Sequence, residues 1–431
     1  MSSAPARGVL SASFLGKLAG IENIVSMDMG GTSFDVSILP KGMILTTNER
    51  IIEDQMNAAD IVDVRSIGAG GGSIAWLDQR GILCVGPESA GADPGPACYG
   101  KGGSRPTVTD ADVVLGYIPA DYFLGGEISL DVSLAEKVIK EEIADPLGVD
   151  VIKAARSIRA VVDGTMADQL LLTCVSSGYD PRNFAICVGG GAGPVHAFDI
   201  AAHLGIKEIY VPKIASAFCA FGMLASADYK YEFSRVLPRL ETQLDLSEVN
   251  TIYQSMEAEG VALLRQIKGL NDGAIRVRRG ADMRYFGQVY DMEATMPETA
   301  PGKTVTQSDL GSLIANFHER HEEIYGYADK AMKTSITSLK LVARGERPPL
   351  KIVEQPASHE DPSEALKRQR PVFSGESGGF VETSCYDGDK LRHGNVITGP
   401  AVIEEKTTTI VIPAKVRVNV DRYGNYVCKL S

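Results

Sequence analysis

The sequence predicts an α/β fold, and three stretches of the chain support this prediction. Residues 25–39 read as a strand, a glycine turn and a second strand. Residues 185–198 read as an apolar strand that runs into three glycines and then into a helix-like segment. Residues 151–176 place apolar side chains three to four positions apart, which is the spacing of one face of a helix. Strands and helices that alternate in this way are typical of α/β folds.

The first glycine turn carries the residue types that bind an anion. Gly30 and Gly31 lack a Cβ, so backbone N–H groups there can approach a phosphate closely. The same stretch supplies hydroxyls and carboxylates, from Asp28, Thr32, Ser33 and Asp35. We expect a phosphate-binding loop, and a plain β-hairpin with a Gly-Gly turn is the alternative interpretation.

This stretch resembles the second phosphate loop of the actin, sugar-kinase and heat-shock-chaperone ATPase superfamily, whose lobes are ribonuclease H-like. Residues 185–198 resemble the adenosine motif of that superfamily. The resemblance implies a site for ATP with Mg²⁺ or Mn²⁺, in which Asp28 and Asp35 are the catalytic, metal-anchoring carboxylates. The nucleotide would rest on residues of the two turns, namely Gly30, Gly31, Thr32, Ser33, Gly189, Gly190, Gly191 and Gly193.

The composition argues against several classes of partner. A net charge of −12 disfavours nucleic acid or an anionic membrane as the main partner. No apolar run is long enough to span a bilayer, and the first residues lack the form of a signal peptide, so we expect a cytoplasmic protein. The seven cysteines include no C-x-x-C pair, which disfavours a disulfide framework or a structural zinc cluster. Cys98 lies in a polar glycine-rich stretch, where a buried or incidental thiol is favoured over a catalytic one.

The character of the chain changes near Arg239 and again near residue 345. Residues 1–239 read as a nucleotide-binding lobe, and residues 240–345 read as a mixed α+β region. Residues 346–431 contain β-branched runs punctuated by proline and glycine, which is typical of a small β-rich domain. We therefore expect one α/β lobe followed by a mixed α+β region and a β-rich carboxyl-terminal domain.

Between the two glycine turns, residues 64–112 are crowded with glycine and proline. Such a segment suits a loop folded tightly around a small ligand better than it suits a core. Its glycine run and its polar residues are candidate substrate-binding residues: Gly70, Gly71, Gly72, Ser73, Glu88, Asp93, Arg105, Asp110 and Asp112. A structural Ω-loop with solvent-facing acids is the alternative.

Several longer motifs make the resemblance more specific. They are D-M-G-G-T-S from Asp28, I-G-A-G-G-G-S-I-A-W from Ile67, G-P-E-S-A-G-A-D-P-G-P-A-C-Y-G from Gly86, P-T-V-T-D-A from Pro106, G-G-A-G-P-V-H-A from Gly190, R-Y-F-G-Q from Arg284 and H-E-x-x-Y-G-Y from His321. Together they look like the hydantoinase A and 5-oxoprolinase family, which also contains subunits of acetone and acetophenone carboxylases. Family members usually begin with another lobe that carries a first phosphate loop, whereas this sequence holds a single D-x-G-G-T, at Asp28. The resemblance therefore implies the carboxyl-terminal portion of a longer member, or a split subunit.

The family resemblance implies an ATP-dependent enzyme that phosphorylates a carbonyl oxygen of a cyclic amide or imide for ring-opening hydrolysis. It implies three partners, which are the missing amino-terminal phosphate lobe, a hydantoinase B-like subunit and a small cyclic amide or ketone substrate. An ATP-dependent ketone carboxylase subunit and a non-catalytic scaffold subunit are the alternatives. The phosphate loop alone would also fit a sugar kinase or a chaperone-like ATPase, but the long motif of residues 86–100 argues against those.

Further ionisable side chains have two interpretations each. His196 follows the second glycine turn, and a capping or packing role is favoured over a base because no titrating partner is evident. His318, His321 and Glu322 have a spacing that can bind a metal, although a solvated helix face is the commoner explanation. Three arginines could grip an anionic substrate or lie on a solvent-facing β-edge: Arg278, Arg279 and Arg284.

Overall fold

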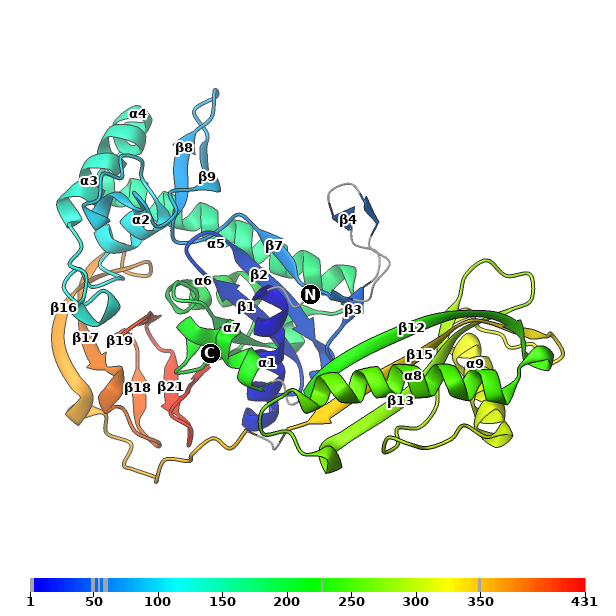
Figure 1. The fold of residues 1–431 in the computed structure, drawn as a ribbon. Helices are drawn as coiled ribbons and strands as arrows, with labels where there is room; N and C mark the ends of the chain where they lie inside the picture. The colour runs from blue at the N-terminus through cyan, green and yellow to red at the C-terminus, as the bar shows by residue number, and fades with distance from the viewer. Residues whose placement is uncertain are drawn as a thin grey trace. The chain divides into compact units, whose positions relative to one another are not determined.

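The computed structural model describes residues 4–47, 51–52, 55–56, 61–225, 228–347 and 350–430. Two compact units emerge from the contacts between residues (Figure 1). Unit 1 combines residues 1–226 with residues 351–431, and unit 2 consists of residues 227–350.

Unit 1 is built on an eight-stranded sheet with the order β18-β21-β22-β11-β10-β1-β2-β7. Its strands are β1 (Ile24–Met29), β2 (Phe34–Leu39), β7 (Arg65–Ile67), β10 (Ala185–Gly189), β11 (Glu208–Val211), β18 (Val396–Thr398), β21 (Arg417–Val420) and β22 (Tyr426–Lys429). The central strands β1, β10 and β11 are parallel, while β2 is antiparallel to β1 and β22 is antiparallel to β11. Strands from the carboxyl end of the chain therefore complete the sheet that the amino-terminal residues begin.

The helices of unit 1 are α1 (Ala4–Ala19), α2 (Val108–Val114), α3 (Val132–Ile139), α4 (Asp145–Leu147), α5 (Val151–Ser176), α6 (Gly193–Leu204) and α7 (Phe218–Ala225). The two longest, α1 and α5, lie beside the eight-stranded sheet (Figure 1). Residues 151–176 thus form the single helix that their periodicity predicts. Asp150 caps its first turn, because the Asp150 carboxylate accepts a hydrogen bond from the N–H of Lys153.

Smaller sheets complete unit 1. A four-stranded sheet has the order β16-β17-β19-β20, and β8 and β9 form a hairpin. The remaining strands are β3 (Thr46–Thr47), β4 (Ile51–Ile52), β5 (Gln55–Met56), β6 (Ile61–Val62), β8 (Ser73–Leu77), β9 (Leu83–Ser89), β16 (Leu366–Ser374), β17 (Gly379–Asp387), β19 (Ala401–Glu404) and β20 (Thr409–Ile412).

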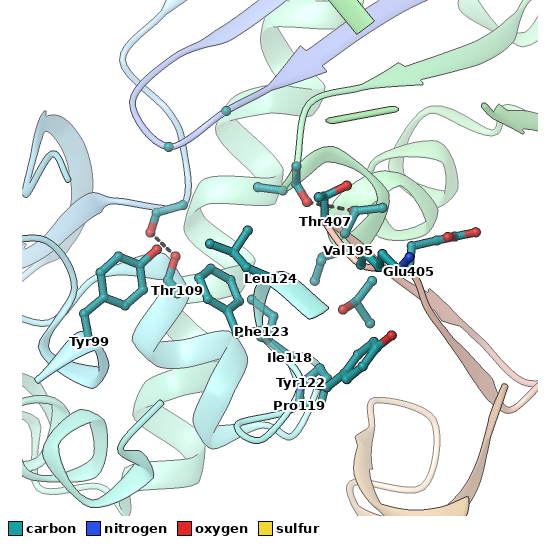
Figure 2. A pocket seen from close by; sticks show the side chains of 18 residues that line it. Tyr99, Thr109, Ile118, Pro119, Tyr122, Phe123, Leu124, Val195, Glu405 and Thr407 are labelled. Atoms are coloured by element: carbon teal, nitrogen blue, oxygen red, sulfur yellow. Dashed lines mark hydrogen bonds between the residues drawn. The ribbon is translucent and has the colours of Figure 1, made fainter. Parts of the chain in front are cut away.

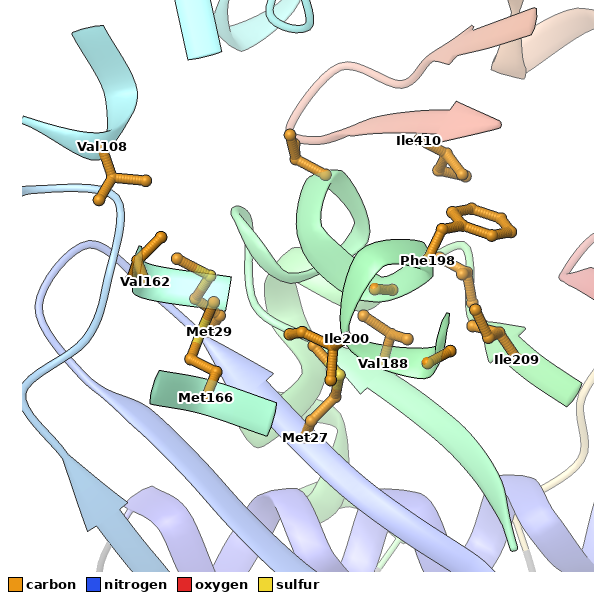
Figure 3. Close-up of a cluster of buried hydrophobic side chains, with 14 of the residues drawn as sticks. Met27, Met29, Val108, Val162, Met166, Val188, Phe198, Ile200, Ile209 and Ile410 are labelled. Carbon is orange, nitrogen blue, oxygen red and sulfur yellow. The ribbon is translucent and has the colours of Figure 1, made fainter. Parts of the chain in front are cut away.

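The main core of unit 1 lies between the eight-stranded sheet and helices α5 and α6 (Figure 3). Met27 and Met29 of β1 are fully buried there, close to Met166 of α5. The same core includes Ile403 and Ile410 from the carboxyl-terminal strands. Burial of this much apolar surface is the dominant favourable term in folding, and it joins residues from both ends of the chain.

Unit 2 is a four-stranded antiparallel sheet with two helices and a separate core. Its elements are β12 (Asp228–Leu240), α8 (Leu246–Arg265), β13 (Ile275–Tyr285), β14 (Met292–Thr295), α9 (Gln307–Tyr325) and β15 (Thr334–Glu346). The strand order is β12-β15-β13-β14, so β12 pairs along its length with β15.

The predicted fold class is confirmed, since an α/β lobe is combined with mixed α+β and β-rich parts. The grouping of residues differs from the three consecutive domains expected from the sequence. Unit 2 begins before Arg239, because β12 belongs to its sheet, and the β-rich end joins unit 1 because β22 pairs with β11. Among the described residues, no helix combines the length and the apolar character that crossing a membrane requires.

Candidate functional site

The first glycine turn joins β1 to β2 and presents an open face. The N–H of Gly30 donates to the carbonyl oxygen of Ser33 at 3.1 Å, which closes the turn. A Cβ built on Gly30 or Gly31 would have no neighbouring atom within 4 Å. Within the part of the chain that the structure describes, the N–H groups of Gly31 and Thr32 have no hydrogen-bond acceptor. These two groups, rather than the N–H of Gly30, are therefore available to an anion.

Two carboxylates flank this turn. Asp28 of β1 and Asp35 of β2 are directly opposite each other in the antiparallel pair. Burial raises the pKa of Asp28, the Cys219 thiol lowers it by donating to Oδ2 at 3.1 Å, and the charge of Asp35 raises it. Asp35 accepts a hydrogen bond from the Ser66 hydroxyl. A cation beside the two carboxylates would stabilise the ionised form of Asp28.

The described residues form no cluster of three or more His, Cys, Asp or Glu side chains that could hold a metal ion. A magnesium ion does not need such a cluster, because it commonly takes one or two carboxylates and completes its shell with phosphate oxygens and water. The pair Asp28 and Asp35 beside an open anion-binding turn fits that requirement.

The glycine run of residues 70–72 packs directly against the first turn. The N–H of Gly71 donates to the carbonyl oxygen of Gly30 at 3.0 Å, and the N–H of Gly72 donates to that of Gly31 at 2.6 Å. A Cβ on Gly70 would lie 2.6 Å from the carbonyl carbon of Gly31. Thr109 of α2 supports this layer in turn, because its N–H and its hydroxyl both donate to the carbonyl oxygen of Gly71. The run therefore holds the first turn in place.

The second glycine turn follows β10 and touches the first. The parallel pairing of β1 and β10 puts Gly189 opposite Asp28. Gly190 has a φ of +83°, and a Cβ there would lie 2.0 Å from the carbonyl oxygen of Met29 and 2.7 Å from Oδ1 of Asp28. The N–H of Ala192 donates to the same Met29 oxygen at 3.1 Å. Only a glycine allows the two turns to approach this closely.

A cavity of about 200 Å³ opens where the two turns meet (Figure 2). Its walls come from both turns, from the segment after α2 and from the loop between β19 and β20. The lining residues are Gly30, Gly31, Gly71, Tyr99, Thr109, Ile118, Pro119, Tyr122, Phe123, Leu124, Gly191, Ala192, Val195, Glu405, Lys406, Thr407, Thr408 and Thr409. The cavity thus has a polar glycine end and an apolar, aromatic wall.

The loop of residues 405–409 is tied to the second turn. The Thr408 hydroxyl donates to the carbonyl oxygen of Gly191 at 2.7 Å, and Thr407 and Ser216 share a hydrogen bond of 2.6 Å between their hydroxyls. Neither this loop nor residues 118–124 was expected at the site from the sequence. The aromatic run Y-I-P-A-D-Y-F-L from Tyr117 is the one signal that could have drawn attention to the second segment.

Other residues proposed for substrate binding lie elsewhere in the glycine-rich centre. Asp110 is buried and caps α2, where it accepts hydrogen bonds from the N–H and hydroxyl of Thr107. The Ser73 hydroxyl is buried and accepts from the N–H of Gly70 at 2.8 Å. Glu88 and Arg105 form an exposed ion pair at 2.7 Å, and Asp93 is exposed. Of the described candidates in the 64–112 segment, only Gly71 lines the cavity.

His196 has the titrating partners that the sequence did not reveal. Its Nδ1 lies 2.5 Å from Oδ1 of Asp163, and its Nε2 lies 3.2 Å from Oδ2 of Asp112. Arg159 pairs with the same two carboxylates, at 2.6 Å from Asp112 and 3.3 Å from Asp163. The expectation that nothing pairs with His196 is therefore wrong, as is the expectation that Asp112 faces a ligand, because both are buried in one ionic cluster.

Three further candidates, His318, His321 and Arg279, are engaged in structural contacts. His318 and His321 belong to an aromatic cluster of unit 2, in which Nδ1 of His318 shares a hydrogen bond of 2.7 Å with the hydroxyl of Tyr285. Arg279 forms a buried ion pair with Glu257 at 2.5 Å. Burial raises the pKa of the Cys98 thiol, so this thiol is protonated and a poor nucleophile at neutral pH.

The chain that forms these two glycine turns and the carboxylate pair beside them matches one family over most of its length. Residues 1–232 match the Hydantoinase/oxoprolinase family, and residues 240–426 match the Hydantoinase/oxoprolinase C-terminal domain. The chain therefore belongs to the hydantoinase/oxoprolinase family, as its motifs predicted.

Relatives in the family carry more specific names. The chain is 35% identical over 430 residues to caprolactamase subunit alpha of Pseudomonas jessenii, covering 99% of this chain and 61% of that subunit. The solved structure of the ATP-dependent caprolactamase from Pseudomonas jessenii matches with a TM-score of 0.71 at 33% identity, over 98% of this chain and 61% of that one. A nucleotide-free structure of acetone carboxylase, an ATP-dependent enzyme, matches with a TM-score of 0.87 at 30% identity, over 99% of this chain and 61% of that one. The chain thus spans 61% of the length of these relatives.

Proposed function

We propose that this chain is the nucleotide-binding part of an ATP-dependent amidohydrolase that activates a carbonyl oxygen of a cyclic amide or imide for ring opening. The observation that carries the proposal is the open turn at Gly30 and Gly31, set between Asp28 and Asp35 and in contact with the second glycine turn. Membership of the hydantoinase/oxoprolinase family supports the amidohydrolase class.

The two turns divide the work of holding the nucleotide. The N–H groups of Gly31 and Thr32, with the hydroxyls of Thr32 and Ser33, would bind terminal phosphate oxygens. Asp28 and Asp35 would hold Mg²⁺ or its waters, and the ion would supply positive charge that neutralises the phosphates. The adenosine would lie against the second turn, Gly189 to Gly193.

Ring opening would proceed by phosphoryl transfer, cleavage of the C–N bond and hydrolysis of an acyl phosphate. The γ-phosphoryl group forms an O–P bond with the carbonyl oxygen, ADP leaves, and the amide N–H proton goes to solvent. Water adds to the activated carbon, the C–N bond breaks to give an acyl phosphate and an amine, and a second water releases phosphate and the carboxylate. The overall change consumes one ATP and two waters for each ring opened.

A ketone carboxylase subunit is the second candidate. Sequence identity to the caprolactamase structure is slightly higher, at 33% against 30%, whereas the TM-score is higher for acetone carboxylase, at 0.87 against 0.71. In that case the same phosphoryl transfer would activate a ketone enolate before carboxylation.

The chain alone should hydrolyse ATP poorly, because it presents one phosphate loop. We propose that a lobe with the first phosphate loop and a hydantoinase B-like subunit complete the enzyme. The caprolactamase relative is named as an alpha subunit, which supports a partner. A scaffold role predicts instead that nucleotide binds weakly even when the partners are present.

The test is phosphate release by the chain, alone and mixed with the two proposed partners. Caprolactam, 5-oxoproline and a hydantoin form one arm, and acetone with bicarbonate forms the other. Stimulation by a cyclic amide with ring-opened product supports the amidohydrolase, and stimulation by acetone with bicarbonate supports the carboxylase. Robust, substrate-stimulated turnover by the chain alone would contradict the need for partners.

A further inference from the structure

The buried ionic cluster around His196 joins three helices behind the cavity. Asp112 comes from α2, Arg159 and Asp163 come from α5, and His196 comes from α6. The side chains of these four residues are at most 6% exposed. Buried charges of this kind are costly unless they are paired, so the cluster constrains how the helices sit relative to one another.

Two of these helices carry or support the glycine turns. On α2, Thr109 donates to the carbonyl oxygen of Gly71, and the N–H of Gly71 donates to that of Gly30 in the first turn. On α6, the helix starts at Gly193, directly after Ala192 of the second turn, whose N–H donates to Met29. A displacement of α6 relative to α2 would therefore change the spacing of the two turns.

We propose that His196 is a positively charged positioning residue, which holds α6 against α2 through Asp112 and Asp163 and thereby fixes the two glycine turns in register for the nucleotide. The nucleotide part of this inference rests on the proposed function. His196 itself does not line the cavity, whereas Val195 beside it does.

The charge count of the cluster favours the imidazolium. Asp112 and Asp163 carry two negative charges, and Arg159 supplies one positive charge within 3.3 Å of each. A neutral His196 would leave one buried carboxylate without a balancing cation. Asp199 of α6 does not change this count, because its side chain is 53% exposed and meets Arg159 at the solvent side, at 2.9 Å. Tyr117 lies under the Arg159 guanidinium, 4.5 Å from ring centroid to Cζ.

The balance of these groups also sets the proton on His196. Burial and the charge of Arg159 lower the pKa of His196, but Asp163 and Asp112 outweigh them and raise it to about 9. His196 and Arg159 in turn hold the pKa of Asp112 below its usual value in spite of its burial. The pKa of His196 is thus higher in the folded chain than in the unfolded chain. The charged imidazole therefore contributes fully to folding stability below about pH 6.5, and this contribution is lost as the pH rises through about 9.

The contact with Asp112 is an ion pair rather than an aligned hydrogen bond. Nε2 of His196 has no hydrogen-bond partner of good geometry, although Oδ2 of Asp112 lies 3.2 Å away. Neutral glutamine in place of His196 could keep one hydrogen bond to Asp163 but would lose the attraction to both carboxylates. The substitution His196→Gln therefore removes the charge more than the volume.

The first measurement concerns the proton. The chain has six histidines, so selective ¹⁵N labelling of imidazoles gives a spectrum in which each can be assigned by substitution. We expect one imidazole signal, absent in His196→Gln, to show both N–H protons at pH values well above the ordinary histidine pKa of about 6.5. Asp163→Asn should lower the pKa of that imidazole, because it removes a negative charge beside His196. A His196 that titrates at or below the ordinary value would overturn the proposal.

The second measurement concerns the turns and needs no nucleotide. Hydrogen exchange is followed at the amides of Gly71 and Ala192, which donate to the carbonyl oxygens of Gly30 and Met29, and at the amide of Gly190 in the second turn, which donates to Ala215. Protection, corrected for the intrinsic pH dependence of exchange, should fall at least about tenfold as His196 loses its proton or is replaced by glutamine. His203→Gln is the matched control on α6, because its imidazole is exposed and, among the described residues, bonds only to the backbone carbonyl oxygen of Asp199. Protection that is unchanged across the titration would overturn the proposal.

The third measurement is ATP affinity of the chain with its partners from about pH 7 to about pH 10, on either side of the His196 titration. The affinity for ATP should fall as the pH rises through that range, both in the wild type and in His203→Gln. Circular dichroism should show that both proteins remain folded over the same range. His196→Gln should bind at least about tenfold more weakly and without that inflection; if this variant does not fold, the wild-type series decides. An ATP affinity that does not depend on the protonation of His196 would overturn the inference. Absence of ATP binding at every pH would instead overturn the proposed function.

Discussion

Asp28 and Asp35 face each other across the antiparallel pair of β1 and β2, so two carboxylates meet at the edge of an open glycine turn. Burial raises the pKa of Asp28, and the neighbouring charge of Asp35 raises it further. Two ionised carboxylates at such a site destabilise the folded chain when no cation is present, and a bound cation would offset this cost. It therefore predicts opposite effects of one substitution on stability and on activity.

Asp28→Asn should raise the melting temperature of the chain without nucleotide or divalent cation. The pKa of Asp28 is raised, so the folded chain favours the protonated form and loses stability as the pH rises through that pKa. An amide removes this penalty, and the gain should shrink toward acid pH. Thermal unfolding over a pH series measures it, with the exposed Asp168→Asn of α5 as the control. A variant that melts below the wild type at every pH would contradict the argument.

The same substitution, and Asp35→Asn, should abolish most ATP-dependent turnover in the assembled enzyme. Loss of one charge-stabilising group typically costs about 2.7–4 kcal/mol in the transition state, or roughly a hundredfold to a thousandfold in rate. Steady-state kinetics should show this loss while Asp168→Asn keeps its rate. Intact rates in both Asp28→Asn and Asp35→Asn would mean that the turn is an ordinary hairpin.

Gly190→Ala should destabilise the chain far more than Gly178→Ala. Both glycines have a left-handed φ, +83° and +81°, which costs an alanine about 1–2 kcal/mol. A Cβ at Gly178 meets open space, whereas at Gly190 it would lie 2.0 Å from the Met29 carbonyl oxygen. The clash should add ~1–3 kcal/mol. Denaturant unfolding of the two variants separates strain from clash, and equal losses would show that the two turns are not in contact.

Local chemistry explains which parts of the site could be foreseen. The two turns are visible in the sequence because glycines, carboxylates and hydroxyls lie within a few residues of each other, as in residues 28–35. The walls at residues 118–124 and 405–409 reach the cavity through tertiary packing and carry no such local signal. The partners of His196 were missed for the same reason, since Asp163 lies 33 residues away on another helix.

The fold shows the same limit. Hydrophobic periodicity gave α5 its bounds, because a helix is made of local contacts. Pairing of β22 with β11 joins segments far apart in the chain, and a run such as residues 426–429 reads as a strand without indicating its neighbour. The carboxyl-terminal strands therefore looked like a domain of their own.

This pairing predicts how the chain can be divided. Truncation after Arg239 removes β22 from the edge of β11 and takes buried residues such as Tyr426 and Ile403 out of the main core. We expect that fragment to lack a cooperative melting transition. Residues 228–350 should fold alone, because their core is separate and includes the fully buried Leu339 and Phe317.

The complementary test keeps unit 1 and removes unit 2. Asp228 and Glu346 are paired across β12 and β15, so the two ends of unit 2 lie side by side and a short Gly-Ser linker can replace residues 227–350. This deletion should melt cooperatively and keep its near-ultraviolet circular dichroism, since every strand of the eight-stranded sheet is retained. Should the fragment of residues 1–239 melt cooperatively while the deletion does not, the carboxyl-terminal strands would be dispensable to the sheet, and the grouping of residues 351–431 with the amino-terminal lobe would be wrong.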